Sequence, residues 1–172
     1  WSPSANRFVY MTSIREGIFI YPYTLKIFAA VPGNSSVLME VPYHDYSVHS
    51  PQFTQDGSRI TFLSNERKAE MSYSDFWNLD PATGERIRIT DLERSGFRAS
   101  GGYVWALSGR ELYLDGKYDV NSPTAIYKLD ISTGVITRVI EPSWDGRYPA
   151  LSPDNTKLAF ISGRSGWKEV WV

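Results

Sequence analysis

The sequence contains no cysteine and only two histidines among its 172 residues. The lack of cysteine excludes disulfide bonds and thiolate metal sites. Lys and Arg total 18 and Asp and Glu total 19, so the formal net charge is −1 at pH 7. A chain with so little net charge has no overall field that would attract nucleic acid or an anionic membrane. No apolar run approaches the roughly 20 residues of a membrane-spanning helix. We therefore expect neither a nucleic-acid partner nor membrane insertion.

Hydrophobic residues make up 42% of the chain and aromatic residues 15%. This is enough apolar material for a core, and the aromatic content is typical of sheets, where flat rings pack on a pleated surface. No window shows convincing helical periodicity. The strongest helical rival, residues 64–76, places Lys68, Ala69 and Glu70 in a polar stretch, and we interpret it as a loop insertion. The composition therefore favours an all-β fold.

One pattern occurs four times along the chain. A large apolar residue, which we call the anchor, is followed seven positions later by another, with a small polar turn between them. The anchors lie 52, 52 and 46 residues apart and are Trp1, Phe53, Trp105 and Leu151. The turn Gln55-Asp56-Gly57 has residues that tolerate left-handed backbone, and Ile60 and Phe62 then alternate on one strand face. Each copy is therefore predicted to form a hairpin.

A second pattern lies between these copies. Leu79-Asp80-Pro81-Ala82-Thr83-Gly84 returns 50 residues later as Leu129-Asp130-Ile131-Ser132-Thr133-Gly134. Each is a strand end and turn that leads into another strand. On the strand after the first of these turns, we expect Arg86 and Arg88 to face solvent and Ile87 and Ile89 to face inward. Each period thus holds two hairpins, and four strands in a period of roughly 40–50 residues are typical of a β-propeller blade.

The fourth copy carries the clearest family likeness. Its segments Leu151-Ser152-Pro153-Asp154, Leu158-Ala159-Phe160 and Glu169-Val170-Trp171-Val172 resemble the WD-like repeat of TolB-type propellers. The Leu-Asp-x-x-Thr-Gly turn is similar to turns in the propellers of prolyl-oligopeptidase-family peptidases. The resemblance implies a β-propeller fold and suggests a periplasmic or other extracytoplasmic location. It implies little about activity, because unrelated functions occur on this fold.

The repeat also predicts how the chain is divided. We expect a single partial propeller domain over residues 1–172, built of four-stranded antiparallel blades. The blades cover approximately residues 1–48, 49–98, 99–146 and 147–172, and the last is incomplete. This is about three and a half blades, fewer than the roughly four to eight of a single-chain propeller. We therefore expect the missing blades to come from the rest of the polypeptide or from another chain.

No catalytic motif is visible. Gly163-Arg164-Ser165-Gly166 is one residue short of the Gly-x-Ser-x-Gly elbow and lies in a predicted hairpin turn. Ser100-Gly101-Gly102 precedes a strand, whereas a phosphate-binding glycine loop opens onto a helix. We accordingly expect no catalytic residues and no cofactor.

Two groups of residues are candidate metal sites. His44, Asp45 and His49 could bind zinc if the backbone folded back, but we interpret them as a polar loop beside a water-filled channel. Asp115 and Asp119 fall short of the spacing and number of ligands in a calcium loop. We expect no metal.

Propellers bind ligands at one end of the channel, through the loops that enter the innermost strands. Here these loops are residues 43–50, 93–102 and 141–148. They supply the candidate binding residues His49, Arg98, Asp145 and Arg147. Trp144 and Trp167 lie in turn-rich segments, where exposed aromatic rings often anchor a partner. Core positions are expected for the remaining tryptophans, which are Trp1, Trp77, Trp105 and Trp171.

Three functions fit these observations. The favoured one is a non-catalytic module that binds a protein partner or another ligand, as in TolB-type proteins. The alternative is the substrate-gating propeller of a prolyl-oligopeptidase-family serine peptidase whose catalytic domain lies outside this chain. A second alternative is a propeller lactonase or lyase with a metal in the channel.

Overall fold

A computed structural model describes residues 1–4, 6–16, 19–29, 35–41, 48–66 and 73–172, without the side chains of residues 13–25, 27–35 and 41. It confirms an all-β chain. The strands form four antiparallel sheets, and within each sheet consecutive strands are neighbours. The chain divides into two compact units, Trp1–Ile89 and Thr90–Val172, each of which is described by itself. No helix in the described part is long and apolar enough to cross a membrane.

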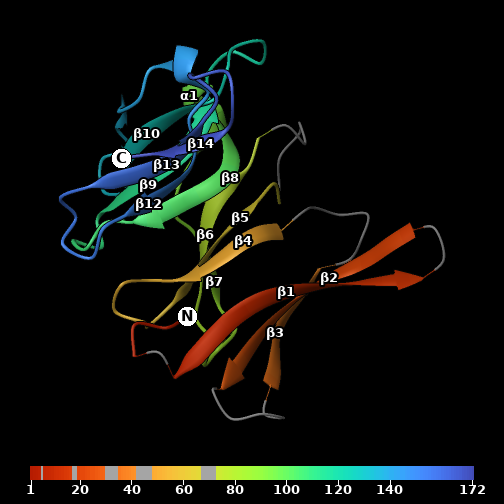
Figure 1. Cartoon of the computed structure of the whole chain (residues 1–172). Helices are drawn as coiled ribbons and strands as arrows, with labels where there is room; N and C mark the ends of the chain where they lie inside the picture. The colour runs from red at the N-terminus through yellow and green to blue at the C-terminus, as the bar shows by residue number, and fades with distance from the viewer. Residues whose placement is uncertain (5, 17–18, 30–34, 42–47, 67–72) are drawn as a thin grey trace. The chain divides into compact units, whose positions relative to one another are not determined.

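The first unit holds two sheets (Figure 1). The first sheet has three strands, β1 (Arg7–Glu16), β2 (Phe19–Ala29) and β3 (Ser35–Val41). The second sheet has four, β4 (Val48–Phe53), β5 (Ile60–Ser64), β6 (Asp75–Leu79) and β7 (Arg86–Arg88). Strands β1 and β4 contact one another, so the two sheets are neighbours. The loop insertion expected over residues 64–76 falls largely on residues 67–72, outside the described residues.

The second unit holds the other two sheets. The third sheet consists of β8 (Arg98–Trp105), β9 (Glu111–Lys117), β10 (Ala125–Asp130) and β11 (Ile136–Arg138). The fourth consists of β12 (Arg147–Leu151), β13 (Leu158–Ser162) and β14 (Glu169–Trp171). Strand β12 packs against both β8 and β9. Two short helical turns, α1 (Leu92–Ser95) and η1 (Pro142–Trp144), precede β8 and β12.

The turns after the anchors Phe53 and Leu151 are closed by their own side chains. In the second sheet Thr54 Oγ1 donates to Asp56 Oδ1 at 2.6 Å and accepts from the Arg59 backbone N–H at 3.1 Å. In the fourth sheet Ser152 Oγ donates to Asp154 Oδ1 at 2.6 Å and accepts from the Lys157 N–H at 2.9 Å. These hydrogen bonds satisfy backbone donors at the turn. The Ser152 hydroxyl, together with the backbone N–H and the hydroxyl of Thr156, holds the pKa of Asp154 down at about 2, since these hydrogen bonds favour the ionised carboxylate.

The third sheet departs from this arrangement as its sequence does. Ala106 stands where Thr54 and Ser152 supply a hydroxyl, so no side chain there can accept the backbone N–H. The turn keeps its backbone bond from Gly109 N–H to the Ala106 carbonyl at 2.9 Å. Gly109 has a φ of 64°, which is why this turn depends on glycine.

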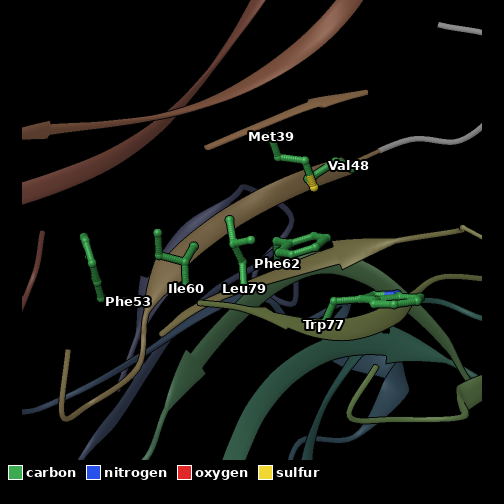
Figure 2. Close-up of a cluster of buried hydrophobic side chains, with 7 residues drawn as sticks. All are labelled: Met39, Val48, Phe53, Ile60, Phe62, Trp77 and Leu79. Carbon is green, nitrogen blue, oxygen red and sulfur yellow. The ribbon is translucent and has the colours of Figure 1, made fainter. Parts of the chain in front are cut away.

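The first unit has a core of seven buried side chains. Figure 2 shows them, one from β3 and six from β4, β5 and β6; they are Met39, Val48, Phe53, Ile60, Phe62, Trp77 and Leu79. Trp77 here and Trp105 in the third sheet are buried, as predicted. The core prediction is wrong for Trp1, which is 73% exposed, although its ring lies beside that of Phe8 with centroids 5.2 Å apart. Trp171 is half-buried.

The prediction for β7 is also wrong in part. Ile87 is 44% exposed rather than turned inward. Strand register explains this, because Arg86 pairs with Leu79 and Arg88 with Trp77, so both arginines share the face of the buried core. Arg86 Nη1 donates to Glu66 Oε2 at 2.9 Å. The aliphatic stems of the arginines therefore cover apolar surface while their charged ends reach partners.

Candidate functional site at the bulges of the inner strands

The first strand of the second, third and fourth sheets, which we call the inner strand, contains an irregularity at the same place. The register shifts between His49 and Gln52 in β4, between Ala99 and Tyr103 in β8, and between Arg147 and Ala150 in β12. Extra residues on one strand at such a point form a β-bulge, and bulges redirect side chains next to functional sites.

The bulge position lies three residues before each anchor. Ser50, Gly102 and Tyr148 occupy it. Ser50 has a φ of 56° and Tyr148 a φ of 52°, both in the left-handed region that non-glycine residues rarely adopt. Such a conformation persists only where surrounding contacts hold it. In the second unit those contacts are visible.

Asp115, on β9, holds two of these bulges. Its Oδ1 accepts the backbone N–H of Gly102 at 2.9 Å, and its Oδ2 accepts that of Tyr148 at 2.9 Å. Gly102 belongs to the third sheet and Tyr148 to the fourth. A single carboxylate therefore links the inner strands of two neighbouring sheets.

The close approach of Asp115 and Tyr148 to the backbone explains why position 102 is a glycine. A Cβ added to Gly102 would lie 2.5 Å from Asp115 Oδ2 and 3.0 Å from the Tyr148 Cα. Any side chain at position 102 would therefore push the carboxylate off one of its two donors. The glycine and the aspartate depend on one another.

Asp115 is only 2% exposed. Burial raises the pKa of its carboxyl above the ordinary value, because a charged group is poorly solvated there. The hydrogen bonds from Tyr148 and Gly102 and the positive charge of Arg147 act in the opposite direction. The carboxylate is thus a buried charge that is compensated only in part.

Arg147 and Asp145 lie at the entrance to β12. The Arg147 guanidinium donates from Nε and Nη2 to Asp145 Oδ1 at 3.2 and 3.1 Å, and the same oxygen accepts the Thr124 N–H at 3.2 Å. Both charged side chains remain about 40% exposed. They form a polar surface next to the buried Asp115.

Trp144 lies on the η1 turn just before this pair. Its carbonyl accepts a hydrogen bond from Ser162 Oγ. The Arg164 guanidinium carbon lies 4.2 Å from the Trp144 ring centroid and 3.4 Å from that of Trp171, so the cation is stacked by two indoles. These three residues line a groove of about 570 Å³ with Val139, Ile140 and Phe160 among its walls.

Two aromatic side chains are strongly exposed in this unit. Trp167 is 79% exposed and Tyr148 is 63% exposed. Trp167 lies on the hairpin turn of residues 163–168, and Tyr148 is the bulge residue of β12. Large exposed aromatic rings are typical of protein-binding surfaces, and Tyr148 directly follows the charged Arg147.

The structure brings some of the predicted site residues together. Trp144, Asp145 and Arg147 are sequence neighbours at the start of β12, and Asp145 and Arg147 are bonded. Arg98 begins β8, where it pairs with Lys117. His49 belongs to the first unit, and burial lowers its pKa. The role of all six candidates in binding remains a prediction.

Sequence reasoning missed Asp115 and Tyr148 as site residues. The signal for Asp115 was a break in the repeat, since ten residues after the anchor the other copies have Leu63 and Ile161. A carboxylate at a position that is otherwise apolar is costly unless it has a role. For Tyr148 the only signal was its place before Pro149.

The structure describes the candidate calcium residues and only part of the candidate zinc site. His44 and Asp45 lie outside the described residues. Asp119 accepts the Asn121 N–H at 2.9 Å and so caps its own turn, while Asp115 binds backbone amides. Among the described residues no group of three or more His, Asp or Glu side chains is arranged to hold a metal ion.

The segment Gly163-Arg164-Ser165-Gly166 forms the predicted turn, with the Gly166 N–H donating to the Gly163 carbonyl at 2.9 Å. The Ser165 hydroxyl donates to Glu169 Oε2 at 2.8 Å. Ser165 therefore has the contacts of a turn residue.

Comparison with known proteins gives the fold a context. No family model and no curated protein matches the sequence. TolB from Acinetobacter baumannii is similar in structure, with a TM-score of 0.67 and 25% identity, over 86% of this chain and 34% of that one. A puromycin hydrolase variant matches with a TM-score of 0.67 and 12% identity, over 98% of this chain and 25% of that one.

An oligogalacturonate lyase in complex with manganese matches less well, with a TM-score of 0.57 and 18% identity, over 87% of this chain and 53% of that one. The chain thus spans about a third of the length of the Acinetobacter TolB. At these identities the lyase and hydrolase matches concern the fold alone. Together with the four antiparallel sheets, the comparisons show that this chain has a β-propeller fold that resembles TolB.

Proposed function

We propose that this chain is part of a non-catalytic β-propeller module that binds a protein partner through the inner-strand end of its second unit. The surface, which we call the binding face, consists of Trp144, Asp145, Arg147, Tyr148 and Trp167. The observation that carries the proposal is the exposed Tyr148 ring on a left-handed bulge, beside the half-exposed Arg147–Asp145 pair.

The chemistry of this face supports protein binding. An arginine with five fixed donors and an aromatic ring with a polar tip are the residue types most enriched at binding hot spots. The likeness to TolB supports the same class of function and, with it, a periplasmic or other extracytoplasmic location. The remaining blades of the propeller would come from the rest of the polypeptide or from another chain.

Site-specific photo-crosslinking tests the proposal. A photoreactive amino acid is placed at position 148 or 167 in the native host, and matched controls carry it at Leu107 and Val135, which are also exposed but lie on the turns after β8 and β10. We expect one discrete protein adduct from positions 148 and 167 and none from the controls. Arg147→Ala should weaken that adduct about tenfold or more, as loss of a hot-spot arginine does.

Equal adducts from all four positions, or none from 148 and 167, would contradict a binding face at this end. The alternative is a gating propeller, and a puromycin hydrolase variant shares the fold over 98% of this chain. It predicts that the adduct joins the chain to a hydrolase domain containing Gly-x-Ser-x-Gly. Mass spectrometry of the adduct distinguishes the two.

A further inference from the structure

We propose that Asp115 is a positioning residue. Its ionised carboxylate accepts hydrogen bonds from the inner strands β8 and β12, a link that we call the clasp, and thereby presents Tyr148 and Arg147 on the binding face. Its role in presentation rests on the proposed function, whereas the clasp itself can be tested without any partner.

The geometry shows why one residue controls both strands. Asp115 lies on β9 opposite the irregular stretch of β8, between the register pairs Ala99–Gly116 and Tyr103–Leu114. There the Gly102 N–H points to the carboxylate instead of a strand partner, and the Tyr148 N–H of the next sheet does the same. Each carboxylate oxygen serves one strand. Losing either oxygen as an acceptor therefore releases one bulge.

Among the described residues, the neighbours of Asp115 that the contacts identify are apolar, lack a side chain or are cationic, so none of them offers a substitute acceptor. On β10 the residue paired with Asp115 is Ile126, which is apolar and buried. From β8 the approach is made by Gly102, which has no side chain. From β12 the charged group that acts on Asp115 is Arg147, itself bonded to Asp145. Arg147 favours the ionised form, so the clasp and the exposed pair support one another.

The free-energy cost of burying the Asp115 carboxylate supports a role for this residue beyond stability. Leu63, which is buried, occupies the same repeat position in the second sheet, so an apolar residue serves a propeller strand well at this point. A buried carboxylate with a raised pKa stabilises the fold less than an apolar side chain of similar size would. Buried charges that lower stability tend to be retained at functional sites.

Protonation changes what the carboxyl group can accept. The ionised group accepts both N–H groups with charge assistance, whereas a protonated carboxyl uses one oxygen to carry a hydrogen and becomes a donor there. The clasp is therefore complete only while Asp115 is ionised.

The test follows backbone amide chemical shifts by NMR as pH is lowered. We expect the Gly102 and Tyr148 amides, 46 residues apart, to shift together with one apparent pKa above 3.8, the ordinary value for aspartate. In Asp115→Asn neither amide should titrate. The Ser132 and Thr133 amides, which bond to Asp130, are internal controls that should titrate below 3.8 in both proteins, because those hydrogen bonds lower the pKa of Asp130.

A second variant separates positioning from folding. Asp115→Leu reproduces the residue of the second sheet, so the chain should keep its stability. We expect hydrogen exchange at the Tyr148 amide to become about tenfold faster or more, as loss of a charge-assisted hydrogen bond would allow. The crosslink from position 148 should weaken in parallel, with the crosslink from 167 as reference.

The outcomes are distinct. Amides that titrate separately, or that still titrate in Asp115→Asn, overturn the clasp whatever the crosslinks show. Joint titration with an unchanged crosslink in Asp115→Leu overturns the role in presentation. Joint titration with no crosslink in the unsubstituted protein leaves the clasp in place and overturns only the binding face.

Discussion

The second and third sheets are built on one plan and differ at a few interior positions. Each has four antiparallel strands, a bulged inner strand and a turn closed by a left-handed glycine. Ten residues after the anchor the second sheet has the buried Leu63 and the third has the buried Asp115. The shared part is what packing requires of a propeller blade. At this position the third sheet has a carboxylate that binds a neighbouring strand, where the second sheet has an apolar side chain that packs. This difference locates the candidate site.

The largest effects should come from positions where the sheets agree. Phe62 and Leu114 lie nine residues after their anchors and are fully buried. Phe62→Ala should lower the free energy of unfolding by about 3–5 kcal/mol and Leu114→Ala by about 2–5 kcal/mol, because each leaves a cavity. Chemical denaturation measures both. If either change cost less than about 1 kcal/mol, that side chain would not be part of a packed core.

Exchanging the residues that differ should give an intermediate and asymmetric result. Leu63→Asp buries a charge in a sheet that lacks the glycine found at position 102, since Ser50 stands at the equivalent place. We expect it to cost about 3 kcal/mol. Asp115→Leu should be neutral or stabilising at pH 7. Equal costs in both directions would show that the carboxylate stabilises the fold as much as leucine does.

The effect of Asp115→Leu on stability should depend on pH. The pKa of Asp115 is raised in the folded chain, so the folded protein binds this proton more tightly than the unfolded one. Its contribution to stability is therefore greatest below the ordinary pKa of 3.8 and is lost as pH rises through the raised value. As pH rises through this interval, the free energy of unfolding of the unsubstituted protein should fall relative to that of Asp115→Leu. A parallel pH profile for the two proteins would contradict the raised pKa.

The smallest effect should come from the turns. Thr54→Ala removes the hydroxyl that bonds Asp56 and the Arg59 N–H, and we expect a loss of about 1 kcal/mol in unfolding free energy. The third sheet has Ala106 at this position already, so Ala106→Gly, which removes no hydrogen bond, is the matched control. Similar losses from both would show that backbone effects, rather than the hydroxyl, account for the change.

The sequence predicted the repeating parts well, because hairpin turns and alternating apolar residues are local signals. The anchors Phe53, Trp105 and Leu151, the buried Trp77 and the turn at residues 163–166 follow from neighbours a few positions away, whereas the anchor Trp1 is exposed. Ile87 was placed wrongly because strand register, which alternation alone does not fix, turns Arg86 and Arg88 to the core face. Asp115 was missed as a site residue because its partners Gly102 and Tyr148 are 13 and 33 positions away. Only the pairing of strands brings them together.

Every strand of each sheet pairs with the strand next to it in sequence. The longest loop to be closed within a sheet is therefore short, and the entropy lost on closing it is small. Each sheet can form as soon as its own segment has left the ribosome, without waiting for distant parts of the chain. A contact such as that of Asp115 with Tyr148 joins residues of two sheets, so we expect docking of the fourth sheet on the third to follow the formation of each sheet.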